Sequence, residues 1–201
     1  MMVFNTARKR DFIPRFDVEG IPIEVVEKQK LLGVQLTNDL KWNENTDYIS
    51  KRGYKKLWIL RRLKINGANT QELKDIYCKH IRSILEYAAV VWHAGLTVEN
   101  KATIERVQKS ALAIILGKGY ISYDNALSTL KLDKLCTRTD KLCLEFARKS
   151  LASNKYSSWF VPDENIQNTR RKIKTVKPVL TRTTRFQKSA LPHLTSILNN
   201  V

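Results

Sequence analysis

Acidic residues, histidines and glycines are the residue types from which a site for phosphoryl or acyl transfer could be built. A two-metal site needs closely spaced carboxylates, but the chain contains no Asp-Asp pair, and its only adjacent acids are Asp163-Glu164, in a predicted loop. Gly117-Lys118-Gly119 lacks the remaining residues of a phosphate-binding loop. The sequence therefore predicts no catalytic residues, and we expect that the protein is not an enzyme. The three histidines stand in no nucleophile motif: His80, His93 and His193.

The cysteines are the remaining candidates for metal chemistry. Cys136 and Cys143 are seven residues apart, which places them on one face of a predicted helix, and Cys78 precedes His80 by two residues. A zinc site needs four convergent ligands, usually marked in the sequence by a close cysteine pair. Neither C-x-x-C nor a paired histidine is present. The pattern predicts free, buried thiols, with no metal and no cofactor.

Basic residues give the strongest signal in the chain. Lys and Arg number 36 against 19 Asp and Glu, which gives a net charge of +17 and a pI near 9.9. This excess favours a polyanionic partner, because neutralised phosphates release counterions. An acidic membrane surface and a merely solvated face are the alternatives. Two segments without acids hold the predicted nucleic-acid-binding residues: Lys51, Arg52, Lys55, Lys56, Arg61, Arg62 and Lys64, then Arg170, Arg171, Lys172, Lys174, Arg182, Arg185 and Lys188.

The hydrophobic pattern predicts a mainly α (α+β) chain in three parts. Residues 1–42 are expected to form short strands, including 2–4 and 30–36, with a hairpin turn at Glu19-Gly20. In residues 43–153, apolar positions recur every three or four residues, which predicts a bundle of about four helices over 45–64, 70–93, 97–116 and 132–152. Asn69 or Thr70 could cap the second helix, with Glu72 in its first turn. The apolar side of this helix would include Ile84, Ala88 and Val91. Residues 154–201 are predicted as an extended basic tail that could end in a short helix after Pro192.

No targeting or membrane segment is evident. No apolar run reaches the roughly 18 residues that a spanning helix needs. Arg8, Lys9 and Arg10 precede no apolar signal segment. We therefore expect an intracellular protein, in the nucleus or the cytoplasm, that is neither secreted nor membrane-bound.

Aromatic residues fall on or beside the apolar stripes, so we expect them in the core, with stacking on bases as the alternative. They are Trp42, Tyr54, Trp58, Tyr87 and Trp92. Gly33 lies inside the predicted strand 30–36. A glycine there marks either a bulge or the close approach of another chain or ligand.

Several segments, in a fixed order, carry a resemblance to a known family. The chain resembles the region just after the catalytic core of a jockey-type non-LTR (LINE-like) retrotransposon reverse transcriptase. Thr139 departs from the pattern, since such proteins often carry a second arginine after the one that matches Arg138. The matching segments are Met2-Val3-Phe4-Asn5, which resembles the strand that leaves the catalytic hairpin, then 30–36 with Leu40-Lys41-Trp42, 81–88 with Val91-Trp92, 104–109, 135–138, 146–149 and 182–192.

The resemblance implies a role for several of these segments. Leu32 and Gly33 would belong to an element similar to the primer grip, and the helices after residue 43 would correspond to the polymerase thumb. The active site would lie upstream of Met1, so the chain would be a fragment without its catalytic aspartates. The expected partner is the RNA or DNA backbone, without sequence preference or a small-molecule substrate; the missing polymerase portion could act in trans.

Two functions remain open at the level of sequence. One is a non-catalytic, thumb-like protein that binds the template-primer backbone. The other is the passive product of a decayed mobile element, or a helical protein-interaction module without selected activity. Salt-dependent binding to nucleic acid distinguishes them, because only the first depends on the clustered cations.

Overall fold

The N-terminal part of the protein forms two small antiparallel hairpins. The structure, a computed structural model, describes residues 2–4, 16–162 and 176–200. β1 (Asp17–Val18) pairs with β2 (Ile21–Pro22) across Glu19-Gly20, whose φ angles of 52° and 79° belong to a tight hairpin turn. The hairpin predicted at this turn is confirmed. Residues 2–4 form no strand, contrary to expectation.

The predicted strand over 30–36 is wrong, because it contains a second turn. β3 (Lys28–Leu31) pairs with β4 (Val34–Thr37), and Leu32 and Gly33 join them with φ angles of 45° and 86°. Both central residues of such a two-residue turn need positive φ, which glycine adopts readily and leucine does not. Gly33 therefore allows a reversal of the chain and not a bulge within one strand.

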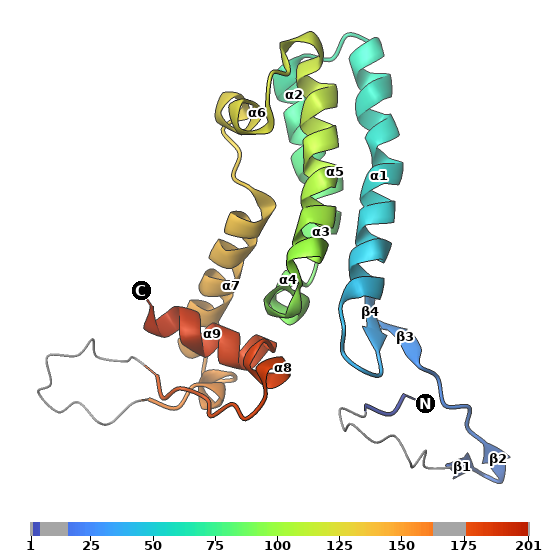
Figure 1. The fold of residues 1–201 in the computed structure, drawn as a ribbon, viewed down its shortest axis with the longest axis vertical. Helices are drawn as coiled ribbons and strands as arrows, with labels where there is room; N and C mark the ends of the chain where they lie inside the picture. The colour runs from blue at the N-terminus through green and yellow to red at the C-terminus, as the bar shows by residue number, and fades with distance from the viewer. Residues whose placement is uncertain (1, 5–15, 163–175, 201) are drawn as a thin grey trace, which may run out of the picture.

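A long helix, α1 (Asn43–Ile65), lies side by side with α5 (Val98–Leu116) (Figure 1). The predicted apolar stripe of α1 is confirmed, since Ile49, Leu57 and Leu60 are buried. Gly53 lies in the same stripe. A methyl group added there would come within 2.9 Å of Val107 Cγ1 and 3.0 Å of Leu85 Cδ2, so the absence of a side chain lets the helices approach closely.

The helix predicted over 70–93 is a chain of shorter segments. α2 (Thr70–Ile76) begins with the expected cap, since Asn69 and Glu72 bond reciprocally. A π-helical segment, η1 (Tyr77–Arg82), follows, and then α3 (Ser83–Glu86), α4 (Ala89–Trp92) and the 3₁₀ turn η2 (His93–Gly95). A π turn holds more residues than an α turn, so the positions that face the core shift by one along the chain. The buried residues are therefore Leu85, Ala89 and Trp92, in place of the predicted 84, 88 and 91.

The remaining helices of the bundle follow α5 and the short turn η3 (Gly117–Gly119). α6 (Tyr123–Leu130), which the sequence did not predict, is capped by the Ser122 hydroxyl. α7 (Leu135–Leu151) corresponds to the helix predicted over 132–152. The mainly helical fold with a small N-terminal β portion is confirmed.

The described part of the tail folds back onto α7 instead of extending away from it. After η4 (Ser157–Trp159), residues 176–200 carry α8 (Thr184–Gln187) and α9 (Ala190–Asn199), and α9 crosses the end of α7 (Figure 1). Proline at the third position of α9 is compatible with its first turn. No helix among the described residues combines the length and apolarity needed to cross a membrane. A second apolar cluster forms from Cys143, Ala147, Phe160, Val176, Leu194 and Leu198.

Candidate nucleic-acid interface

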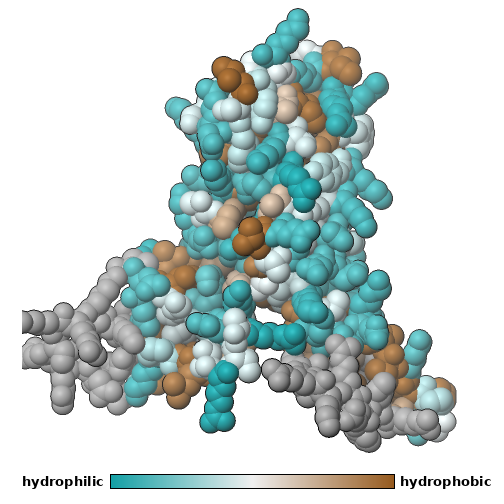
Figure 2. Space-filling model, in the orientation of Figure 1, coloured by the Kyte–Doolittle hydropathy of each residue, from teal (hydrophilic) through white to brown (hydrophobic). Residues whose placement is uncertain are grey.

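The exposed face of α1 holds six of the seven cations predicted in this segment. Lys51, Lys55 and Arg62 follow one another at helical spacings of four and seven residues, which places them on a single stripe opposite the buried one. Arg52 and Lys56 flank this stripe on one side, and Arg61 flanks it on the other. We call these six exposed residues the α1 cationic face. Figure 2 shows that hydrophilic residues dominate one side of the bundle, with hydrophobic residues in small separate patches.

The α1 cationic face has few internal counter-charges. None of the ion pairs formed among the described residues involves its six members. The acids of α1 are Glu44 and Asp47, both in its first two turns, and Glu44 lies 3.5 Å from the amine of Lys28. The like charges therefore remain available for an external anion.

Lys64 does not belong to this face. Its position on the helix turns it toward α5, where Nζ donates hydrogen bonds to the carbonyl oxygens of Ile114 at 2.5 Å and Ile115 at 3.1 Å. These carbonyls belong to the last turn of α5, where the helix dipole favours a cation. Lys64 thus caps the C-terminal end of α5 and lies outside the candidate interface.

Two exposed aromatic side chains lie on the α1 cationic face. Trp58 is 58% exposed and Tyr54 is 42% exposed, so the prediction that these rings pack in the core is wrong. Trp58 follows Tyr54 by four residues and precedes Arg62 by four, so the two rings and the cation form one row. An exposed ring among cations can stack on a base while its neighbours contact phosphates.

The other aromatic residues divide between core and surface. Trp92 is buried, as predicted, and its indole N–H donates to the Tyr87 carbonyl at 2.9 Å. Trp42 is half-buried at the start of α1. Tyr87 is exposed, contrary to expectation, and its hydroxyl donates to the carbonyl oxygen of Leu32 at 2.9 Å.

The hairpin of β3 and β4 presents the residues that resemble a primer grip. Leu32 is 84% exposed at its tip. Gly33 packs against Tyr87, because a methyl group at this glycine would lie 3.0 Å from the ring carbon Cε1. The structure thus explains Gly33 by the turn and by this ring, while the Leu32 side chain is free to contact a ligand.

Tyr48 connects this hairpin to the α1 cationic face. The amine of Lys30 lies 5.0 Å from the centre of its ring, and the guanidinium of Arg52 lies 5.4 Å from it. Lys30 lowers the pKa of the Tyr48 hydroxyl, and Arg52 adds to the effect. Positive charge therefore continues from the helix onto β3.

Two described cations of the tail, Arg185 and Lys188, lie near the start of α1. Arg182, Arg185 and Lys188 are exposed. Arg185 and Lys188 line an open groove together with Lys41 and Trp42. The tail thus brings positive charge to the N-terminal end of α1, and the four predicted residues Arg170, Arg171, Lys172 and Lys174 lie outside the described residues.

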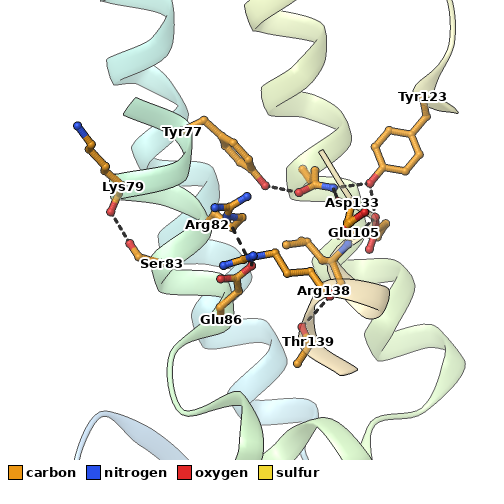
Figure 3. Close-up of polar contacts among 12 residues, drawn as sticks. Tyr77, Lys79, Arg82, Ser83, Glu86, Glu105, Tyr123, Asp133, Arg138 and Thr139 are labelled. Atoms are coloured by element: carbon orange, nitrogen blue, oxygen red, sulfur yellow. Dashed lines mark hydrogen bonds and ion pairs between the residues drawn. The ribbon is translucent and has the colours of Figure 1, made fainter. Parts of the chain in front are cut away.

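A polar network inside the bundle fixes the position of α7 (Figure 3). The side-chain amide of buried Gln108 donates to the Tyr123 hydroxyl at 2.8 Å and to the Asp133 carbonyl at 3.0 Å, and its oxygen accepts from Tyr77. Glu105 accepts from Tyr123 and, at 3.2 Å, from the backbone N–H of Leu135, the first residue of α7.

Arg138, one of the residues that carry the family resemblance, has a structural partner. Its Nε lies 2.6 Å from a carboxylate oxygen of Glu86, which also lies 3.5 Å from Nε of Arg82 (Figure 3). Thr139 is buried, and its hydroxyl donates to the Leu135 carbonyl at 2.7 Å. This part of α7 therefore faces the bundle and contributes no free cation to the α1 cationic face.

One set of potential metal ligands converges among the described residues, although no metal was expected from the sequence. His93, Cys136 and Asp140 each offer a ligand atom, and these atoms lie within 4.8 Å of one another. The only sequence signal is the spacing of four residues between Cys136 and Asp140, which places both on one face of α7. Comparison of the chain with protein-family models, curated proteins and solved structures gives no match.

Proposed function

We propose that this protein binds the phosphate backbone of nucleic acid through the α1 cationic face, without sequence preference and without catalysis of its own. The observation that carries the proposal is the set of six exposed cations on one side of one helix, unpaired with any acid among the described residues. Neutralising phosphates with such a set releases counterions, which favours association.

The geometry favours contact with the phosphates of nucleic acid over hydrogen bonding to base edges. α1 is held along its length by α5 and β4, so it offers only one side to a ligand. From Lys51 to Arg62 that side carries lysines and arginines and no asparagine or glutamine, the side chains that pair with adenine. Tyr54 and Trp58 add surfaces that can stack on any base.

We expect no polymerase centre among the described residues. The only group of three metal-ligand side chains found there contains a single carboxylate, Asp140. Nucleotidyl transfer by two metal ions requires several. We therefore expect no template-dependent nucleotide incorporation by the purified chain, with any divalent ion.

The resemblance to retrotransposon reverse transcriptases supports a more specific ligand. A thumb holds the template-primer duplex by its backbone, and the α1 cationic face has the charge and the one-sided exposure for this contact. An RNA–DNA hybrid or a primed template is therefore the ligand we propose, and the missing polymerase portion is a further candidate partner in trans.

The test is a salt titration of binding to a labelled duplex, a hybrid and a single strand. If about six phosphates are neutralised, log K should fall with log salt at a slope of roughly −5 on the duplex. A triple variant, Lys51→Ala, Lys55→Ala and Arg62→Ala, should flatten the slope by roughly 3. The variant Trp58→Leu should weaken single-strand binding by about 1–3 kcal/mol with little change in slope.

A matched control removes the same net charge elsewhere. Lys79, Lys131 and Lys155 are exposed and form no ion pair among the described residues, and none lies on α1. Replacing these three by alanine should leave the slope near that of the wild type. If both triple variants lose affinity equally, binding follows net charge alone and the α1 cationic face has no special role. A salt-independent affinity favours the passive product or protein-interaction module.

A further inference from the structure

Three segments far apart in the sequence meet where η2 contacts α7 and α9. His93 stands at the start of η2, and Cys136 and Asp140 lie on successive turns of α7. Nε2 of His93 lies 2.8 Å from Oδ1 of Asp140. The thiol of Cys136 completes a set of nitrogen, sulfur and oxygen atoms within 4.8 Å of one another.

The surroundings of this set suit a metal ligand. His93 is 2% exposed, so its imidazole is almost fully shielded from bulk water. Apolar residues wall the small pocket beside it, including Leu85, Ile104 and Leu135. The side chain of Asp140 is about half exposed, so the set is open to solvent on one side.

A second histidine from α9 lies next to the set. The ring centres of His93 and His193 are 6.3 Å apart. Nε2 of His193 is buried and has no hydrogen-bond partner among the described residues. Such a nitrogen loses its hydrogen bond to water without replacement, which is costly unless something else binds it.

We propose that His93, Cys136, Asp140 and His193 form a zinc site. Two imidazoles, a thiolate and a carboxylate make a four-ligand set that suits Zn²⁺, whereas Mg²⁺ and Ca²⁺ prefer oxygen ligands alone. Zinc–ligand distances of about 2.0–2.3 Å place neighbouring ligand atoms roughly 3.5 Å apart in a tetrahedron. The His93–Asp140 contact must therefore open by several tenths of an ångström, and the Cys136 thiol must close around the ion. His193 lies outside the group of atoms within 4.8 Å of one another, so its ring must turn toward the ion.

Zinc at this position would hold the C-terminal helix α9 against α7 and η2. α9 supplies His193, α7 supplies Cys136 and Asp140, and η2 supplies His93, so one ion would join three elements. The α1 cationic face contributes no ligand, so the zinc site does not depend on the proposed nucleic-acid binding.

One charge opposes the metal. Lys101 lines the same pocket, and its positive charge disfavours a cation there. Replacing Lys101 by methionine, which keeps most of the apolar stem, should therefore tighten zinc binding if the ion sits in this pocket.

The test uses the full chain, free of any affinity tag and kept reduced. Titration with Zn²⁺ against a coloured chelator should give one ion per chain. Titration with Co²⁺ should give the intense visible absorption of a tetrahedral site together with a thiolate-to-cobalt charge-transfer band. The zinc affinity should fall on the order of a hundredfold in Cys136→Ser, and the charge-transfer band should disappear.

Matched variants assign the ligands. Asp140→Asn and His193→Gln should each weaken zinc binding at least about tenfold, in the range seen for ligand-sphere changes. Cys78→Ser is the control, because this half-buried thiol in η1 lies outside the set and its loss should leave the cobalt spectrum unchanged. Absence of stoichiometric zinc, or a wild-type cobalt spectrum in Cys136→Ser, overturns the proposal. Unchanged zinc affinity in His193→Gln overturns the assignment of the fourth ligand.

Discussion

Lys64 Nζ donates to the carbonyl oxygen of Ile115 at 3.1 Å, so a cation on α1 closes the last turn of α5. The side chain reaches across the helix pair and also bonds the Ile114 carbonyl. In the sequence Lys64 looks like one more member of a cationic run, but its angle around α1 differs from that of Lys51, Lys55 and Arg62. The run therefore contains two kinds of lysine: one that caps α5, and one that is exposed without an ion pair among the described residues.

This difference predicts opposite effects for two lysine variants. Lys64→Met should lower the free energy of unfolding by about 1–2 kcal/mol, because charge-assisted hydrogen bonds to two carbonyls are lost. Its salt slope for nucleic-acid binding should stay unchanged. Lys55→Met should leave stability within about 0.5 kcal/mol and flatten the salt slope by about 1. Urea denaturation and a salt titration measure both effects, and a flattened slope in Lys64→Met contradicts the assignment.

The π-helical segment predicts which of two neighbouring apolar residues supports the bundle. Leu85 is buried against α1, whereas Ile84 is only partly buried. Leu85→Ala should lower the free energy of unfolding by about 2–5 kcal/mol, and Ile84→Ala should lower it by distinctly less. Equilibrium denaturation of both variants tests this order. Equal losses, or a larger loss at Ile84, would mean that the buried stripe keeps the ordinary helical register.

The left-handed conformation of Leu32 predicts a gain in stability from asparagine. Leu32→Asn creates the Asn-Gly pair favoured in two-residue hairpin turns, and it relieves a strained backbone at a highly exposed position. The free energy of unfolding should rise by about 1 kcal/mol. Leu31→Asn is the control, because Leu31 is also exposed but lies in β3 without a positive φ.

The same variant tests the role that resembles a primer grip. If the Leu32 side chain contacts a primer terminus, Leu32→Asn should weaken binding to a primed template more than binding to an uninterrupted duplex. The stability measurement separates this effect from unfolding. An equal affinity of wild type and variant for both ligands would leave Leu32 with a conformational role only.

The helices were the most predictable part of the structure, because local spacing and capping residues determine them. The buried stripe of α1 and the Asn69 cap could be read from neighbouring positions in the sequence. The second hairpin was missed because Leu32 is an unfavourable residue for its turn. The π turn in η1 was missed because one extra residue per turn leaves no clear sign in a short apolar stretch.

The candidate sites were less predictable, because they depend on how the helices pack. The number and clustering of basic residues indicated the cations of α1. The hydrogen bonds that set Lys64 apart from the other cations depend on the packing of α1 on α5. The exposure of Trp58 follows from the same packing. His93, Cys136 and His193 come from three separate segments, and no short spacing in the sequence predicts that they meet.

Asp39, at the turn between β4 and α1, gives a prediction about acid stability. Burial raises its pKa, but hydrogen bonds from the Thr37 hydroxyl and from Lys41, together with the Lys41 charge, outweigh this and lower the pKa from 3.8 to about 2. Oδ1 accepts from the Thr37 hydroxyl at 2.8 Å and from the Lys41 backbone N–H at 3.1 Å, and Oδ2 lies 3.0 Å from the Lys41 amine. The folded state therefore holds the ionised form more tightly than the unfolded state does.

A carboxylate whose pKa is lower in the folded state stabilises the protein above its unfolded pKa, and this contribution is lost as the pH falls through the folded pKa. Asp39→Asn should therefore lower the free energy of unfolding by about 1 kcal/mol at pH 7, after allowance for the screening of a partly exposed pair. The difference between wild type and variant should persist at pH 5, shrink below about pH 4 and vanish near pH 2. Urea denaturation at each pH measures it, with Asp47→Asn as the control, because this exposed residue forms no ion pair among the described residues. A difference that grows on acidification would show that the Asp39 carboxylate is not held by Thr37 and Lys41.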